Sequence, residues 1–293
     1  MHPRWNMQKT LNNGIEPVSN GRERGGQISW RENIITGVFL FACYILGGSY
    51  IDFFRGYLPG DGLSRLVSAW LVSQGTVVKL SSIGFIWPPI PTLLLVPWAL
   101  IPSLFKNWMA VVVVSSLAAT IACLMVGQIA RICGVSKWWR RVIVFLFAVN
   151  PLVVIFAING MSEAILMAAT LIAGYWLIRF WQTGRYTHLI FSAFFFGLLP
   201  LIRYEFALVT AWSGLLILLL IWEKRHQYSR EKFGQFLEGV LLAYISLVIY
   251  PLFLWVLSNW FIMGSPFYFL ANNRTQPMLL NFNCLLTELS QHP

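Results

Sequence analysis

Three acidic residues lie where long apolar segments begin or end. Asp61 lies in the sequence GDGLSR, Glu163 in NGMSE and Glu205 in LIRYE. An ionisable side chain at a membrane boundary is costly to keep there, so each is a candidate functional residue. The four histidines are predicted on the inner side or lie near a terminus, so a carboxylate is the natural base for chemistry on the outer side. Asp61 and Glu163 are therefore candidates for a base or for metal ligands.

Two arginines accompany these acids. Arg203 lies two residues before Glu205, and Arg65 lies four residues after Asp61. A guanidinium group binds phosphate oxygens well, so Arg203 is a candidate phosphate ligand. Mg²⁺, and by the same argument Mn²⁺, is often held by one or two carboxylates together with substrate phosphate oxygens. We therefore predict Asp61 and Glu163 as the ligands of a Mg²⁺ or Mn²⁺ ion.

Each of these residues also has a structural interpretation. Asp61 could cap the helix that follows it, and Glu163 could favour the positive end of its helix. Arg203 and Glu205 could form an ion pair, or Arg203 could extend to lipid headgroups. Three further interpretations are structural: solvent or lipid phosphate around Arg65, a boundary position for Asp52, and interfacial anchoring by Trp87 and Trp98.

The composition is that of a membrane protein. Apolar residues make up 57% of the chain and charged residues 11%, whereas a soluble domain carries about 25% charged residues. The net charge of +10 does not point to nucleic acid, because Lys and Arg lie in short loops between apolar segments, where they set membrane orientation. The four cysteines include no C-x-x-C pair, which argues against a disulfide framework or a zinc site.

Apolar length and charge bias predict seven membrane-spanning helices. Clear spans are predicted at 33–51, 108–130, 141–158, 161–181, 206–222 and 236–260, and a seventh at 188–202. The apolar segment 84–105 contains five prolines and is a poor straight span. If this segment lies on the outer side, most of the 21 basic residues fall on the inner side, as the positive-inside rule requires.

The expected fold is therefore an all-α membrane protein with surface helices in its first external loop. A disordered cytoplasmic tail is predicted at 1–32 and a transmembrane module at 33–262, within a bacterial or archaeal plasma membrane. The external loop 52–107 would hold two surface helices, 61–73 and 89–105. In the first, apolar residues recur at helical spacing on one face, and Asp61, Ser64, Arg65 and Ser68 mark the other.

The chain resembles the GT-C superfamily of integral membrane glycosyltransferases. The resemblance is to its phospholipid-carrier-dependent branch, which includes protein O-mannosyltransferases and aminoarabinose transferases. It rests on the order of five stretches, none of them specific alone: GDGLSR (60–65), GFIWPPIPTLL (84–94), NGMSE (159–163), LIRYE (201–205) and GSPFYFL (264–270).

The resemblance implies an inverting sugar transfer from a polyprenyl-phosphate donor to an acceptor hydroxyl. Asp61 would be the catalytic acid of the first loop and would activate the acceptor. Glu163 would bind metal or orient substrate, and Arg203 would hold the donor phosphate. With Glu205 and Arg65 added, the predicted substrate-binding residues are Glu163, Arg203, Glu205 and Arg65.

Two features depart from that family. Asp61 is followed by Gly62 instead of a second acid, and members of the family continue beyond a seventh helix. We expect the segment 263–293 to be an external tail, and the chain to be a fragment, a shortened gene or a degenerate copy. The alternatives to a transferase are a non-catalytic membrane protein of the same fold and a lipid or solute transporter. No internal repeat of the kind common in transporters is visible.

Overall fold

The computed structural model describes residues 30–51, 60–74, 80–227 and 229–271. These ranges leave out Asp52 and the residues that follow it up to 59. They also leave out most of the predicted tails 1–32 and 263–293. All regular structure in the described part of the chain is helical. The α-helices are α2 (Trp30–Tyr50), α3 (Gly60–Gln74), α4 (Pro89–Ala99), α5 (Pro102–Lys106), α6 (Met109–Ile132), α7 (Lys137–Ala148), α8 (Pro151–Ile158), α9 (Glu163–Thr183), α10 (Tyr186–Ile202), α11 (Ala207–Glu223), α12 (Arg230–Met263) and α13 (Tyr268–Ala271). Short 3₁₀ helices are η2 (Leu80–Ile83), η3 (Tyr204–Phe206) and η4 (Lys224–Gln227).

Five described helices are long and apolar enough to cross a membrane. They are Arg31–Tyr50, Met109–Ile132, Glu163–Thr183, Tyr204–Glu223 and Arg230–Met263, and each falls on a predicted span. A sixth span results if α7 and α8, which are bent, are counted together. These helices support a multi-pass membrane protein. The predicted seventh span corresponds to α10, whose 17 residues are short for a bilayer, so the count of seven stays a prediction.

The predicted span 141–158 is divided into two helices. It consists of α7 and α8, whose axes differ by 61°. The break lies at Asn150, because the residue before a proline is driven out of the helical conformation. Asn150 has φ −58° and ψ 128°, and its side chain accepts a hydrogen bond of 3.0 Å from the Leu152 N–H to begin α8. Pro151, at the first position of α8, needs no hydrogen-bond partner there.

The predicted surface helix 89–105 is likewise divided, into α4 and α5. Ile101 lies between them in an extended conformation, φ −92° and ψ 106°, and it precedes Pro102. The same steric restriction therefore separates both pairs of helices. The predicted helix 61–73 is present as α3, with nearly the same bounds.

The core of the bundle is built around α6, which contacts α2, α7, α8 and α9. Its buried side chains are mostly small, which lets neighbouring helices approach closely. Ser115 and Ser116 both donate hydrogen bonds to the Ala157 carbonyl of α8, at 2.8 and 3.0 Å. Besides α6, α9 also packs against α10, and α10 packs in turn against α12.

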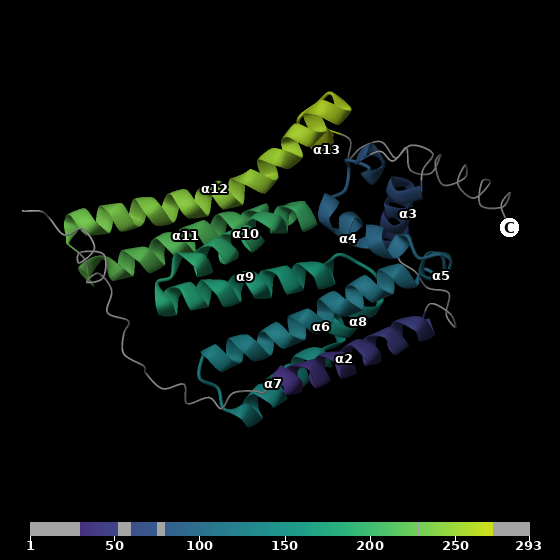
Figure 1. Cartoon of the computed structure of the whole chain (residues 1–293), viewed down its shortest axis with the longest axis horizontal. Helices are drawn as coiled ribbons and strands as arrows, with labels where there is room; N and C mark the ends of the chain where they lie inside the picture. Colours follow the sequence, from purple (N-terminus) through teal and green to yellow (C-terminus); the bar gives the residue numbers. More distant parts are fainter. Residues whose placement is uncertain (1–29, 52–59, 75–79, 228, 272–293) are drawn as a thin grey trace, which may run out of the picture.

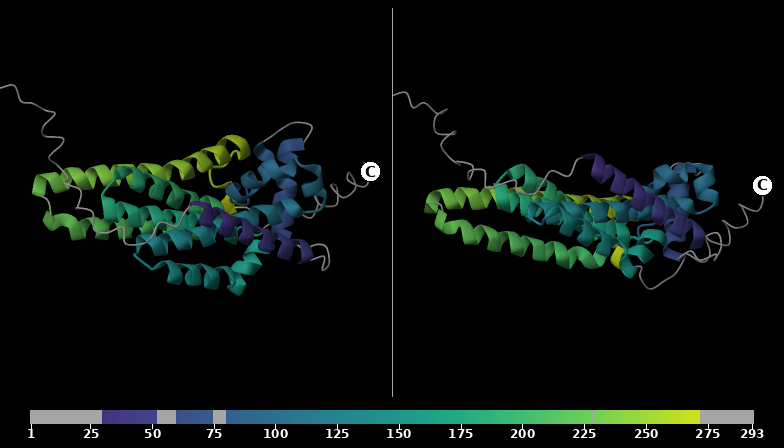
Figure 2. Two further views of the ribbon diagram at one scale, coloured as in Figure 1. Left: turned by 60° about the horizontal axis from the view of Figure 1, so that its bottom comes forward. Right: turned by 90° about the horizontal axis from the view of Figure 1, so that it is seen from below.

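The short helices gather at one end of the bundle. Figure 1 shows α3, α4 and α5 at one end of the bundle, beyond the ends of α9 to α12 and beside the ends of α2 and α6, with α3 lying across the long axis. The two further views in Figure 2 keep these helices at the same end. Trp70 of α3 stacks on Phe105 of α5, with ring centroids 5.5 Å apart. The short helices thus form a cap over the region where α9 begins and α10 ends.

Candidate functional site

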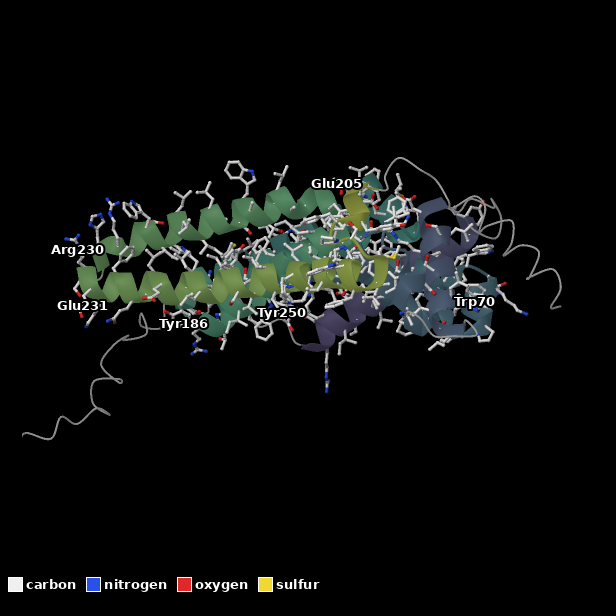
Figure 3. The ribbon with its side chains drawn as sticks, turned by 90° about the horizontal axis from the view of Figure 1, so that it is seen from above. Trp70, Tyr186, Glu205, Arg230, Glu231 and Tyr250 are labelled. Atoms are coloured by element: carbon white, nitrogen blue, oxygen red, sulfur yellow. The ribbon has the colours of Figure 1, made fainter. Side chains whose placement is uncertain are left out.

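A cavity of about 250 Å³ lies between this cap and the ends of the long helices. It is lined by residues of α3, of the segment that leads into α4, and of the junction between α10 and α11. These residues are Asp61, Arg65, Ile86, Trp87, Pro88, Ile202, Arg203, Tyr204 and Glu205. Figure 3 shows Glu205 at the cap end of the bundle and the exposed pair Arg230 and Glu231 at the opposite end.

α3 brings Asp61 and Arg65 to the cavity from a single face. The two residues are four apart, so their side chains lie one helical turn from each other. The fully buried face of α3 consists of Gly62, Arg65, Leu66 and Ala69. The prediction that Arg65 lies on a polar outer face is therefore wrong, because this side chain is only 5% exposed.

Gly62 explains how α3 lies so close to the bundle. A Cβ atom at this position would lie 3.3 Å from the carbonyl oxygen of Gly160, in the turn before α9. A larger residue would push α3 away from this turn. The close contact between the two glycines therefore brings the first turn of α3 beside the first turn of α9, which begins with Glu163.

The Arg65 side chain makes no hydrogen bond or ion pair with any described residue. Its guanidinium lies 5.5 Å from the ring centroid of Trp87, and its Nε is buried without a partner. Burial lowers the pKa of Arg65, and the negative charges of Asp61 and Glu163 oppose that effect. Arginine nevertheless keeps its charge in proteins, so the cavity wall holds a buried cation with donors to spare.

Glu163 is held by the turn that precedes it and by Arg203. Gly160 in this turn has φ +71°, and Asn159 accepts a hydrogen bond of 2.9 Å from the Met161 N–H. Glu163 Oε1 accepts a hydrogen bond from Arg203 Nη1, whereas Oε2 is buried without a partner among the described residues. Glu163 also lies at the positive end of α9, as its structural interpretation required.

Arg203 links two carboxylates at the junction of α10 and α11. Besides Glu163, it donates a hydrogen bond of 3.2 Å from Nη2 to Glu205 Oε1. Burial lowers the pKa of Arg203, but the hydrogen bond to Glu205 and the charge of Glu163 outweigh it, so the pKa is raised. The structural interpretation of Arg203 and Glu205 as an ion pair is confirmed.

The structure brings all five predicted site residues together. Asp61, Arg65, Arg203 and Glu205 line the cavity, and Glu163 joins them through Arg203. Sequence reasoning gave no role to Tyr204, a wall residue whose ring stacks on Phe269 of α13 with centroids 4.9 Å apart. Its position between two charged candidates was the available signal. Trp87 was interpreted as an interfacial anchor, and no spacing in the sequence relates it to Arg65.

The donor set fits a divalent cation only with help from a ligand. No group of three or more His, Cys, Asp or Glu side chains that could hold a metal occurs in the described part of the chain. Arg203 occupies Glu163 Oε1, which leaves Oε2 and the Asp61 carboxylate as donors. Two carboxylates completed by phosphate oxygens are a common Mg²⁺ environment, so the residues present are compatible with Mg²⁺ or Mn²⁺ held together with a phosphate.

Comparisons of the chain with protein-family models, with curated proteins and with solved structures gave no match.

Proposed function

We propose that this protein transfers a sugar from a polyprenyl-phosphate donor to an acceptor hydroxyl at the outer face of a membrane, with Asp61 as the general base. The observation that carries the proposal is the pairing of Asp61 with Arg65, one turn apart on α3 and lining one cavity at the end of an apolar bundle. A carboxylate and a guanidinium that makes no hydrogen bond to a described residue are what such a displacement needs at the two reacting ends.

The reaction places one residue at each end of the bond that is exchanged. Asp61 accepts the proton of the acceptor hydroxyl, whose oxygen bonds to the anomeric carbon as the bond from that carbon to the phosphate oxygen breaks. The electron pair leaves with the phosphate, and the anomeric configuration is inverted. A bound Mg²⁺ or Mn²⁺ would supply positive charge for the departing phosphate, held by Asp61 and Glu163.

Arg65 is a better phosphate ligand than Arg203, to which the family resemblance gave that role. The Arg203 guanidinium already engages Glu163 and Glu205, whereas Arg65 has no hydrogen-bond partner in the described part of the chain. A buried guanidinium nitrogen without a hydrogen-bond partner is costly, and a phosphate oxygen that accepts from Arg65 Nε would relieve that cost. Arg203 would instead keep Glu163 and Glu205 in place beside the donor.

The charge of the site gives a reason for a metal. Three carboxylates, of Asp61, Glu163 and Glu205, stand against the two guanidinium groups of Arg65 and Arg203, so the set carries one net negative charge. A donor phosphate would enter against that charge. A divalent cation that arrives with the donor would reverse the balance, which is the role we assign to Mg²⁺ or Mn²⁺.

The proposed membrane arrangement keeps the site within reach of a lipid-linked donor. Seven spans, counting α10 as one and the bent pair α7 and α8 as one, would place the N-terminus inside and α3, α4 and α5 at the outer surface. The polyprenyl tail would stay in the hydrocarbon beside the bundle while the sugar phosphate enters the cavity under the cap.

The test uses purified full-length protein in lipid nanodiscs. Mannosyl and aminoarabinosyl polyprenyl phosphates are supplied with Mg²⁺ or Mn²⁺ and an extract of native membranes as acceptor source, and released polyprenyl phosphate is measured. Asp61→Asn should lower the rate about 10²- to 10⁴-fold, the usual contribution of general-base catalysis. Arg65→Gln should also lower the rate, and chelation by EDTA should abolish it.

The matched control is Glu231→Gln, which removes an acid at the opposite end of the molecule (Figure 3). Its rate should equal that of the wild type. Equal turnover in Asp61→Asn and wild type would overturn the assignment of the base. Absence of turnover in a folded wild-type protein with every donor would favour the non-catalytic alternative.

A transporter is the second candidate, and the bend between α7 and α8 is the observation that favours it. Discontinuous helices are frequent at transporter substrate sites, where they carry charges toward the bundle interior. Here Val149 and Asn150 at the break are exposed, and neither is ionisable. Flux of a donor lipid between leaflets of proteoliposomes, undiminished by Asp61→Asn, would support this candidate over the transferase.

A further inference from the structure

A second cavity, of about 390 Å³, lies between α2, α6 and α7. It is formed by the first half of α2, the middle of α7 and the second half of α6, whereas the cavity with Asp61 lies under α3 near the beginning of α9. The two cavities share no residue. The volume of the second cavity falls in the range of about 300–1,000 Å³ that is usual for small-molecule sites.

The polar and apolar residues of this cavity are separated along the helix axes. Glu32 in the first turn of α2 and Arg140 and Arg141 in the first turns of α7 give it a charged end. Phe39 of α2 and Phe145 of α7 lie further along the same two helices and give it an apolar end. One charged end followed by an apolar groove matches the two parts of a phospholipid.

The charged end is positive. Lys137 Nζ lies 2.6 Å from Glu32 Oε1, and Arg141 Nη2 lies 3.5 Å from the same oxygen. Among the described residues at this end, three basic side chains, Lys137, Arg140 and Arg141, lie with one acidic side chain, Glu32. Arg140 is only 1% exposed, so this charge lies in the wall of the groove and not in open solvent.

Two exposed indoles lie in the first turn of α7, the helix that carries Arg140 and Arg141. Trp138 and Trp139 follow Lys137 in α7 and are 68% and 60% exposed. Exposed tryptophans next to basic residues are typical of the level of the lipid headgroups. A groove at this level, with cations at one end and phenyl rings along its wall, fits the phosphate and the upper acyl chain of a lipid in the adjoining leaflet.

We infer that the groove binds one anionic glycerophospholipid. The phosphate lies at Arg140 and Arg141, and an acyl chain follows Phe39 and Phe145 between α2 and α7. Basic pockets between transmembrane helices are known to take anionic headgroups. The inference does not depend on the proposed transferase activity.

The experiment compares lipid affinity among full-length variants by native mass spectrometry. Delipidated protein is titrated with phosphatidylglycerol or phosphatidylcholine in mixed micelles. In Lys137→Gln/Arg141→Gln both changed side chains are exposed, so the fold should persist. The loss of two basic residues should weaken phosphatidylglycerol binding by roughly 5- to 25-fold. The matched control Arg230→Gln/Lys232→Gln, which removes two exposed charges from α12, should bind like wild type.

A second pair of variants tests the acyl groove. Thr36 is an exposed residue that lines the cavity, so Thr36→Trp should fill the groove without disturbing the core. Ile34→Trp places the same indole on α2 outside the cavity and is its control. Thr36→Trp should weaken phosphatidylglycerol binding at least fivefold, and Ile34→Trp should not.

Three results would overturn the inference. Equal affinity of the wild type for phosphatidylglycerol and phosphatidylcholine would indicate ordinary surrounding lipid. Equal phosphatidylglycerol affinity in all variants would place bound lipid elsewhere. Displacement of the lipid by millimolar inorganic phosphate would indicate a site for a soluble anion instead of a lipid.

Discussion

At the scale of residues, Arg203 joins parts of the chain that are far apart in sequence. One carboxylate partner, Glu163, is the first residue of α9, and the other, Glu205, lies in η3. The Arg203 side chain therefore links the N-terminus of α9 to the junction of α10 and α11. The pair with Glu163 is half-buried, with side-chain exposures of 31% and 18%. Glu205 is 68% exposed, so its pair with Arg203 is screened by solvent and contributes little.

Removal of Arg203 should therefore act mainly through Glu163. Arg203→Gln leaves a half-buried carboxylate without its cation and should destabilise the protein by about 1–3 kcal/mol. Arg203→Gln/Glu163→Gln should lose less than the sum of the single variants, because the two residues form one interaction. Thermal unfolding in detergent micelles measures both. Arg185→Gln, at the other end of α10, is the control and should stay within about 0.5 kcal/mol of the wild type.

At the scale of elements, the site depends on two close backbone approaches. Gly62 lets α3 approach the turn before α9, and Gly160 in that turn faces Val111 of α6. A Cβ at Gly160 would lie 2.7 Å from the Val111 Cβ, closer than real atoms approach. The turn is therefore confined between α3 and α6, and it sets the start of α9, where Glu163 accepts a hydrogen bond from Arg203 of the cavity wall.

Gly160→Ala should destabilise the protein by roughly 2 kcal/mol or more, since it adds both a steric overlap and an L-residue at positive φ. Gly174→Ala is the control, because Gly174 lies inside α9 with no atom within 4 Å of a Cβ there. That change should be neutral or stabilise by about 0.5–1 kcal/mol. Thermal unfolding of the two variants compares them directly, and equal stability would contradict the confinement of the turn.

At the scale of the whole molecule, the charges mark the two ends of the bundle. Glu205, which lines the cavity, lies toward the cap end. Arg230 and Glu231, in the first turn of α12, lie at the opposite end (Figure 3). α12 has 34 residues, or about 51 Å at 1.5 Å per residue, which exceeds the hydrocarbon core of about 30 Å. A helix of that length extends beyond the core, so its terminal residues should be accessible to water.

Cysteine labelling tests the predicted orientation. In a cysteine-free variant in oriented membranes, Lys106→Cys on α5 and Arg230→Cys on α12 should react with a membrane-impermeant maleimide from opposite sides. Charge bias predicts that Lys106→Cys reacts from outside and Arg230→Cys only after permeabilisation. Labelling of both from one side would contradict the proposed topology.

The amino-acid sequence by itself determined the helical membrane class and the places of the long helices. These depend on apolar length and charge, which are properties of each segment alone. The breaks at Asn150 and Ile101 were also encoded locally, by the prolines that follow, although continuous hydropathy predicted unbroken helices.

Only the tertiary structure decided which way α3 faces and what Arg203 holds. Successive residues are about 100° apart around a helix, and polar and apolar residues alternate irregularly in α3. The sequence pattern therefore placed Arg65 on the outer face of α3. Its burial follows from the approach of Gly62 to Gly160, nearly a hundred residues away in the chain. Such a contact depends on how separate helices pack, and no local pattern carries it.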